Sequence, residues 1–145
     1  MRTQNPSDLL VPKASTVAKT YVNADLDLTF NPNPVTGDVN PLRDIEAIKR
    51  SVKNLILTNF QERPFQPEIG SGVRGLLFEL ADPITMHDIE TAISRTINNF
   101  EPRVNIIEVT VDDDVDNNAY NVSITFQVIA TEQVGNATII LERLR

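Results

Sequence analysis

The sequence has no cysteine among its 145 residues and a single histidine, His87. Disulfide bonds, thiolate metal sites and cysteine nucleophiles are therefore excluded. A zinc site needs several Cys or His ligands, which this chain does not supply. We expect no metal and no cofactor, and we interpret His87 as an ordinary residue near the start of a helix rather than as a catalyst.

Basic residues and long apolar runs are also scarce. There are 13 Lys and Arg against 20 Asp and Glu, which gives a net charge of −7. Proteins that bind phosphate backbones present a basic face, so nucleic acid is not an expected partner. No apolar run approaches the ~20 residues that span a bilayer, and the N-terminal MRTQNPSDLLVPKAS lacks the apolar core of a signal peptide. The acidic balance suits solubility or a basic partner surface.

Prolines are concentrated near the N-terminus, where five of the nine come before residue 42. Each removes a backbone donor and disfavours helix in the residue before it. The one periodic piece is ADLDLTF, in which Leu26, Leu28 and Phe30 alternate with polar residues, as in a short strand. We therefore divide the chain into an extended N-terminal arm, residues 1–40, which needs a surface to lie on, and a single α+β domain, residues 41–145.

The first predicted helix begins after Asn40, a capping residue, with Pro41 at its first position. An apolar stripe follows at helical spacing. Lys49, Arg50 and Lys53 fall on or near the opposite face. They form either a solvated helix face or a docking surface.

The loop FQERPFQPEIGSG breaks this helix with two prolines and two glycines, and its aromatic side chains are expected to tuck onto the core. VRGLLFEL then predicts a short second helix anchored by Leu76, Leu77 and Leu80. The third helix starts with a capping-box-like pair, Thr85 and Asp88, and ends before Pro102. Its predicted buried stripe comprises Met86, Ile89, Ile93, Ile97 and Phe100.

Three strands should follow, packed against the three helices as a small C-terminal antiparallel sheet. VNIIEVTV places Ile107, Val109 and Val111 on one face. ATIILERLR gives the last strand, and an antiparallel meander is the economical topology. The cleanest alternation is AYNVSITFQVIA, which predicts inward side chains at Tyr120, Val122, Ile124, Phe126 and Val128.

The turn DDDVDNN superficially resembles the start of a calcium-binding loop, because its aspartates alternate. That loop requires Gly at its sixth position and Glu at its twelfth, where this chain has Asn117 and Ser123. We interpret the segment as a solvated hairpin turn.

The junction between the third helix and the first strand of the sheet holds Glu101, Pro102 and Arg103. No catalytic signature such as a nucleophile elbow or a phosphate-binding loop occurs in the chain, so positive signs of an enzyme are absent. Arg103 suits bidentate binding, and Pro102 limits the entropy lost on docking. The residues alone leave two interpretations open: a docking point, or Arg103 paired with its neighbour Glu101.

The succession ERPFQPEIGSGVRGLLFE, then NNFEPRV, then an alternating sheet resembles the baseplate wedge proteins of contractile-tail phages. The family includes a type VI secretion baseplate component and is often described as lysozyme-like. The resemblance covers residues 42–130 well, and YVNADLDLTFNPNPVTGDV looks like the N-terminal arm of phage members. Ile69 stands where relatives often have an aromatic residue. The most specific marks are Arg63, Pro64, Phe65, Pro67 and Gly70, followed by Glu101, Pro102 and Arg103.

The resemblance implies a structural protein of the virion, in the tail baseplate, assembled in the host cytoplasm. It implies binding of the wedge core by Glu101, Pro102 and Arg103, with residues 63–70 as a supporting loop. It also implies nucleation of the sheath by strand addition at Thr138, Ile140 and Glu142. Expected partners are other wedge proteins, the sheath protein, and tail tube or hub proteins. The alternatives are a peptidoglycan-degrading enzyme and a type VI secretion component.

Overall fold

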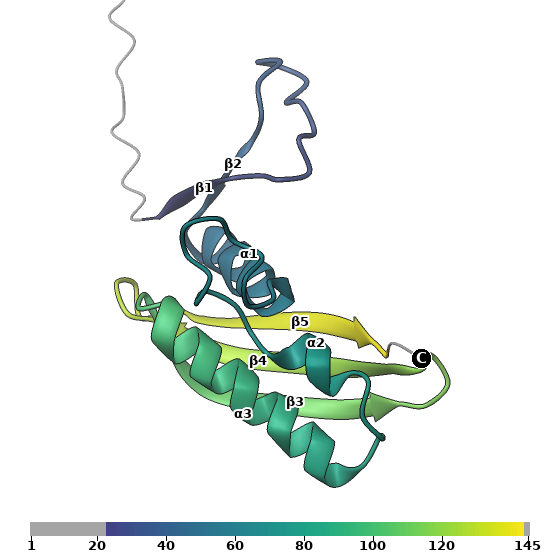
Figure 1. Cartoon of the computed structure of the whole chain (residues 1–145). Coiled ribbons are helices and arrows are strands. Elements are labelled where there is room, and N and C mark those ends of the chain that lie inside the picture. The colour runs from purple at the N-terminus through teal and green to yellow at the C-terminus, as the bar shows by residue number, and fades with distance from the viewer. Residues whose placement is uncertain (1–22, 144–145) are drawn as a thin grey trace, which may run out of the picture.

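The computed structural model describes residues 23–143. Three helices cover one face of a three-stranded antiparallel sheet, and a two-stranded hairpin stands away from this body (Figure 1). This confirms the predicted α+β fold. The elements are β1 (Ala24–Leu26), β2 (Pro41–Arg43), α1 (Asp44–Leu57), α2 (Val73–Leu76), α3 (Pro83–Phe100), β3 (Val104–Asp114), β4 (Ala119–Val128) and β5 (Val134–Glu142).

The sheet is an antiparallel meander in the order β3-β4-β5, as predicted. Its centre is β4, which pairs along its length with both neighbours. All five side chains predicted to point inward on β4 are buried, and their polar neighbours face the other side of the sheet. Strict alternation therefore reports a strand with one face on a core and one in solvent.

Strand β3 departs from the predicted alternation at Ile107. The pairing register shifts between Ile106 and Glu108, so Ile107 has no partner on β4. One extra residue in a strand moves the side chains beyond it to the opposite face. Ile106 and Val109 consequently pack against the core, whereas Ile107 is exposed, so its predicted place on the same face as Val109 and Val111 is wrong.

The third helix matches its predicted stripe, with Ile89, Ile93 and Ile97 fully buried. It ends at Phe100, as the proline at position 102 predicts. Its start is different: the cap is Asp82, whose side chain accepts a hydrogen bond of 2.7 Å from the Thr85 N–H. The predicted Thr85–Asp88 capping pair is therefore wrong, because Asp82 followed by a proline at the first helical position already satisfies the helix end.

The first helix begins at Asp44 rather than at Pro41, so the predicted cap at Asn40 is also wrong. Pro41 lies in β2, where it pairs with Leu26 of β1. Pairing with β1 holds residues 41–43 extended, and the helix can start only where that pairing ends.

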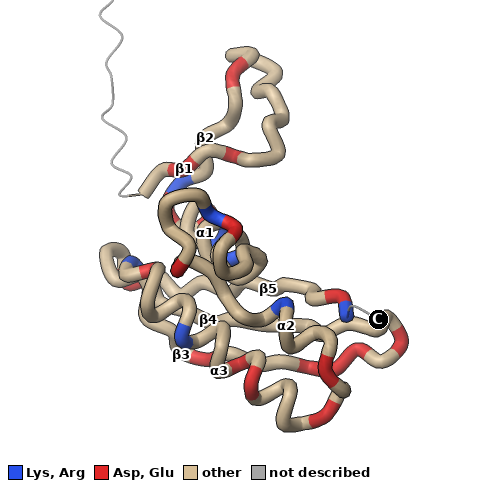
Figure 2. The backbone as a smooth tube through the Cα atoms, viewed as in Figure 1, with Lys and Arg blue, Asp and Glu red and all other residues tan. Residues whose placement is uncertain are grey.

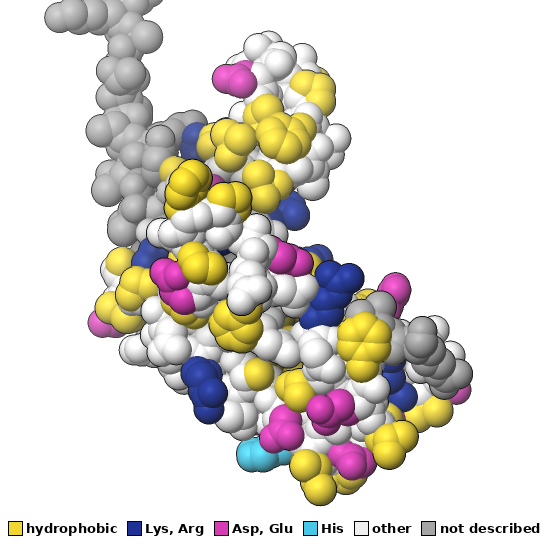
Figure 3. All heavy atoms as spheres, viewed as in Figure 1, with side chains coloured by type: hydrophobic (Ala, Val, Ile, Leu, Met, Phe, Trp, Pro, Cys, Tyr) yellow, Lys and Arg dark blue, Asp and Glu magenta, His cyan; other side chains and the backbone are white. Residues whose placement is uncertain are grey.

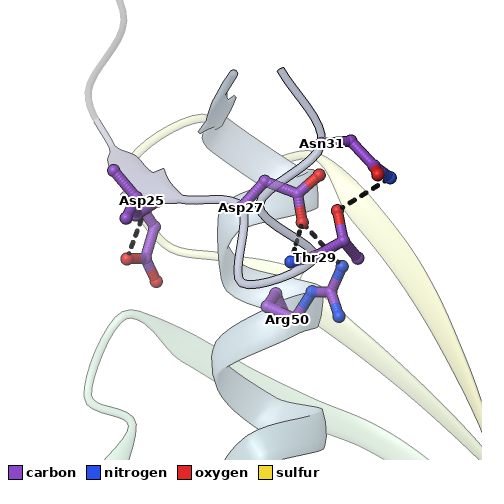
Figure 4. Close-up of polar contacts among 6 residues, drawn as sticks. Asp25, Asp27, Thr29, Asn31 and Arg50 are labelled. Atoms are coloured by element: carbon purple, nitrogen blue, oxygen red, sulfur yellow. Dashed lines mark hydrogen bonds and ion pairs between the residues drawn. The ribbon is translucent and has the colours of Figure 1, made fainter. Parts of the chain in front are cut away.

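The hairpin formed by β1 and β2 is fixed to α1 by a polar contact. Figure 4 shows Asp27 held between Thr29, whose N–H donates a 3.0 Å bond to Oδ1, and Arg50 of α1, whose Nη2 lies 3.1 Å from the same oxygen. The pKa of Asp27 is lowered, chiefly by the hydrogen bonds from Thr29 and also by the Arg50 charge. The described part of the predicted arm thus folds back on itself, and residues 1–22 lie outside the described residues.

The second helix is a single turn, Val73–Leu76. Val73 and Leu77 are buried in the core and Leu76 packs against it. Leu80 is 83% exposed, so it is not the anchor predicted for it. The turn ends before Leu80, and the helical spacing that would have brought this side chain back to the core is lost.

Replacing Leu77 with Ala should lower the free energy of unfolding by about 2–4 kcal/mol, because it leaves a cavity in the core. Replacing Leu80 with Ala should change it by less than about 0.5 kcal/mol. Urea denaturation of both variants measures this difference. An equal loss for the two would contradict the packing of the α2 turn.

Candidate functional site

The junction between α3 and β3 is built around a buried carboxylate. Glu101 is 4% exposed and caps the end of α3, where its N–H donates a 2.8 Å bond to the Ile97 carbonyl. The guanidinium of Arg103 binds it bidentately: Nε donates to Oε1 at 2.6 Å and Nη2 donates to Oε2 at 2.7 Å. Ser51 of α1 donates a third bond to Oε2, also at 2.6 Å.

These contacts keep Glu101 ionised. Burial alone would raise the pKa of Glu101, but the hydrogen bonds from Arg103 and Ser51, together with the Arg103 charge, outweigh burial and lower it. The pKa of Arg103 is raised, chiefly by its hydrogen bonds to Glu101 and also by the charges of Glu101 and Asp25. At neutral pH both side chains are therefore charged and in direct contact as an ion pair.

The two open interpretations of this junction now separate by residue. Glu101 is turned inward and used within the chain. The Arg103 side chain is 38% exposed, and among the described residues no acceptor binds its Nη1. Pro102 is exposed beside it. A partner that approaches this corner meets Pro102 and the outer side of Arg103, held in place by Glu101.

The supporting loop lies close to the junction in space, although far from it in sequence. A cavity of about 270 Å³ is lined by Arg63 and Ile69 of the loop, by Asp25 and Leu28 of the hairpin, and by Ser51 and other residues of α1 and α3. Since Ser51 also binds Glu101, the tertiary structure brings both sequence motifs to one region. No sequence signal marks Ser51, which was missed.

The loop presents its two aromatic side chains to solvent instead of to the core. Phe65 is 100% exposed and has a positive φ of 69°, and Phe60 is 53% exposed, so the expectation that they tuck onto the core is wrong. Three neighbours in the motif, Arg63, Pro64 and Pro67, are exposed as well. The loop is closed by the Gln61 N–H, which donates to the Pro67 carbonyl at 2.8 Å.

Gly70 fixes the return of this loop to the body. A Cβ at this position would lie 2.6 Å from the Asn59 carbonyl carbon and 2.8 Å from the Phe60 nitrogen. Both are backbone atoms that cannot move aside cheaply. Only glycine allows this close approach, which gives a physical reason for its place in the motif.

The second candidate surface is the edge of β5. Along antiparallel strands the hydrogen-bonding residues alternate. Val128 N–H binds the Gln133 carbonyl and Arg143 N–H binds the Asn118 carbonyl, at 2.8 and 2.9 Å. Because the residues that bond to β4 alternate between these two fixed points, the backbone groups of five residues of β5 face away from β4, namely Val134, Asn136, Thr138, Ile140 and Glu142.

The two edges of the sheet are not equivalent. The β3 edge carries the Ile107 bulge and ends in Asp112, Asp113 and Asp114. Bulges and charges of this kind discourage pairing with a further strand. Strand β5 pairs regularly with β4 and shows no register shift, so the β5 edge is the better template for strand addition.

The candidate catalytic groups in the described part of the chain are its carboxylates and His87. The described residues contain no cluster of three or more His, Cys, Asp or Glu side chains that could hold a metal ion. A general acid requires a raised pKa, whereas each described carboxylate with a resolved shift has a lowered one. His87 is exposed at the surface of α3. The described helices include none that is both long and apolar enough to cross a bilayer.

Comparison with known proteins gives a consistent result. The family described as baseplate wedge protein gp25 matches residues 43–133. Baseplate wedge protein gp25 of Enterobacteria phage T4 is 32% identical over 113 residues, which cover 78% of this chain and 83% of that protein.

Two solved structures share the fold at lower identity. One is a candidate tail lysozyme from Geobacter sulfurreducens, with a TM-score of 0.64 and 21% identity, covering 68% of this chain and 89% of the other. The other belongs to the anti-feeding prophage baseplate, with a TM-score of 0.58 and 19% identity over 85% of this chain and 87% of that chain.

The Glu101–Arg103 pair should make stability depend on pH. Replacing Arg103 with Ala should lower the free energy of unfolding by about 3 kcal/mol at neutral pH, because it leaves a buried carboxylate without its charged partner. The pKa of Glu101 is below its usual value of 4.5 in the folded state. The ion pair therefore contributes fully to the free energy of unfolding at pH values above 4.5. This contribution is lost as the pH falls through the lowered pKa of Glu101.

The measurement is urea denaturation of the native chain and the Arg103→Ala variant between neutral and acidic pH. Arg95→Ala, at an exposed position on α3, is the matched control and should be nearly neutral. The difference between native chain and variant should shrink below the usual carboxylate pKa. A difference that is the same at every pH would mean that only packing by the Arg103 stem matters.

Proposed function

The chain belongs to the family of baseplate wedge protein gp25, and we propose that in the contractile-tail baseplate it is an assembly protein with two docking surfaces. The first, the junction surface, comprises Pro102, Arg103 and the exposed loop residues Arg63, Pro64, Phe65 and Pro67. It binds the wedge core. The second is the β5 edge, which nucleates the sheath by accepting a strand from the sheath protein.

The main support for wedge-core binding by the junction surface is the geometry of Glu101 and Arg103. A buried carboxylate holds Arg103 at two atoms and leaves the rest of its guanidinium outward. A side chain fixed in this way loses little entropy when it binds. Phe65 is a fully exposed aromatic in the loop motif, whose Arg63 lines the same cavity as Ser51, the partner of Glu101. Arginine and aromatic side chains dominate binding energy at protein interfaces. Glu101 and Gly70 act as positioning residues.

The β5 edge supports the second assignment. It presents outward backbone groups at Thr138, Ile140 and Glu142. Regular unpaired edges bind extended segments through main-chain hydrogen bonds. The exposed Thr138 and Glu142 side chains would limit pairing with unsuitable strands.

We further propose that the chain is not an enzyme. Its phage relative is described as a wedge protein, and the likeness to a candidate tail lysozyme is one of fold alone. The most buried described carboxylate, Glu101, is ionised and has both oxygens bound, so it cannot deliver a proton to a glycosidic oxygen. Absence of peptidoglycan clearing by the pure protein tests this point, and clearing that Glu101→Gln removes would overturn it.

Replacing Phe65 with Ser should weaken capture of the wedge proteins by roughly thirtyfold, the effect of a strong interface anchor, and leave the free energy of unfolding unchanged. The tagged chain is produced together with the tail proteins of its own particle, and the captured proteins are quantified by mass spectrometry. Phe78→Ser is the matched control, because Phe78 is also exposed but lies outside the junction surface. Equal capture by both variants would remove Phe65 from the interface.

Replacing Thr138 with Pro should reduce sheath capture by about tenfold, because it removes one outward N–H. The fold should survive, since this N–H does not bind β4. Thr138→Val keeps the N–H and serves as the control. If Thr138→Pro captures as much sheath protein as Thr138→Val, strand addition at the β5 edge is wrong.

A further inference from the structure

Among residues 23–143 no strand pairs with the outer edge of β5, and this edge lies at the bottom of a groove whose other wall is α1. The inner face of β5 packs close under this helix: a Cβ on Gly135 would lie 2.9 Å from Ile45 Cδ1. Two cavities lie one after the other along the edge of β5. One of about 310 Å³ includes Asn136, Ala137 and Thr138, and one of about 450 Å³ includes Ile140, Leu141 and Glu142. A strand added to β5 would therefore turn alternate side chains toward α1.

The first half of this groove is basic. Its α1 wall consists of Lys49, Arg50 and Lys53, with Glu46 as the one acidic lining residue. Lys49 pairs with Glu46 at 2.9 Å and Arg50 with Asp27 at 3.1 Å. Lys53 is exposed and has no partner among the described residues.

This local excess of positive charge is opposite in sign to the chain as a whole, which carries −7. Figure 2 shows basic residues on α1 and near α2, whereas acidic residues gather at the β3–β4 turn and between α2 and α3. The groove thus attracts carboxylates that the rest of the surface repels.

The second half of the groove is mainly apolar. It is lined by Ile56, Leu57, Val73 and Leu77 from the helical side and by Ile140 and Leu141 of β5, with Arg74 and Glu142 as its charged residues. Leu57 is exposed in the chain by itself. A large aliphatic or aromatic side chain entering this cavity from the inner face of an added strand would cover it.

The two halves lie about four residues apart along β5, from Ala137 to Leu141, which corresponds to roughly 13 Å of strand. Both residues point to the inner face. Positions four apart on an added strand also share a face. One carboxylate and one large apolar side chain, spaced by four residues, would therefore fill both halves together.

We propose that the segment added to β5 is an acidic strand, with an Asp or Glu facing Lys49 and Lys53 and a large apolar residue four positions away in the cavity beside Leu57 and Leu141. This inference rests on the proposed function and specifies the chemistry of its partner. The groove would reject strands with a basic residue at the first position, because it would face Lys53 directly.

The test uses the full chain and synthetic peptides. In each peptide, threonine alternates with the residues that are meant to face the groove. The probe carries Glu and Leu four positions apart on one face, in either order, to allow both strand directions. A first control has the same composition with Glu moved by one residue, which places it on the opposite face. A second control replaces Glu with Lys. Fluorescence anisotropy gives the Kd, and amide hydrogen exchange reports protection at Thr138 and Ile140.

The probe should bind at least fivefold more tightly than either control at low salt, and added salt should reduce this preference. Lys53→Glu should remove the preference. Arg95→Glu should preserve it, because Arg95 lines the separate groove beside β3.

The outcomes separate the two levels of the hypothesis. If the Lys-containing control protects the Thr138 and Ile140 amides as well as the probe does, strand addition stands and the acidic preference is wrong. If no peptide protects these amides, the proposed function of the β5 edge is wrong. If they are protected before any peptide is added, another part of this chain or a second copy occupies the groove, which also overturns the proposal. Dependence of that protection on protein concentration identifies the second copy.

Discussion

The corner between α3 and β3 depends on one buried ion pair. The Glu101 carboxylate lies where the third helix ends, and it would be costly to bury if Arg103 and Ser51 did not bind both of its oxygens. Ser51 belongs to α1, so the same carboxylate connects the first helix to the start of the sheet. The Arg103 carbonyl also accepts the Ile129 N–H at 3.0 Å, which fixes the end of β4 to this corner. An interaction that stabilises the domain thus also orients the outward side of Arg103.

The two outer edges of the sheet differ in their capacity to pair with a further strand. Its centre is protected because β4 is paired on both sides, while the two outer strands differ in kind. The bulge at Ile107 and the aspartates at the end of β3 make one edge a poor template. The β5 edge is regular and runs beneath α1, whose basic side chains line the groove beside it. An assembly protein needs one open edge and one closed edge, because two open edges would permit uncontrolled chain-to-chain pairing.

Exposed apolar side chains also occur outside the two proposed docking surfaces. Figure 3 shows hydrophobic side chains on the hairpin loop that stands away from the body and at the end of the molecule between α2 and α3. These sets comprise Leu28, Phe30 and Val35 in the hairpin, and Phe78, Leu80 and Ile84 near α3. Apolar surface of this kind is typical of proteins that work inside a larger assembly. The division of the chain into an arm, residues 1–40, and a separate domain stays a prediction.

The sequence by itself determined the α+β class, the meander and the buried faces of α3 and β4, because each of these follows from periodic burial along a single segment. Local steric rules also placed the end of α3 before Pro102. Only the tertiary structure decided the start of α1, where pairing of β1 with β2 overrides the capping signal at Asn40, and the β3 bulge, which depends on its partner strand. It alone brought Ser51 to Glu101 and Arg63 to the same cavity. These contacts join residues distant in the chain, and no local pattern encodes a distance between them.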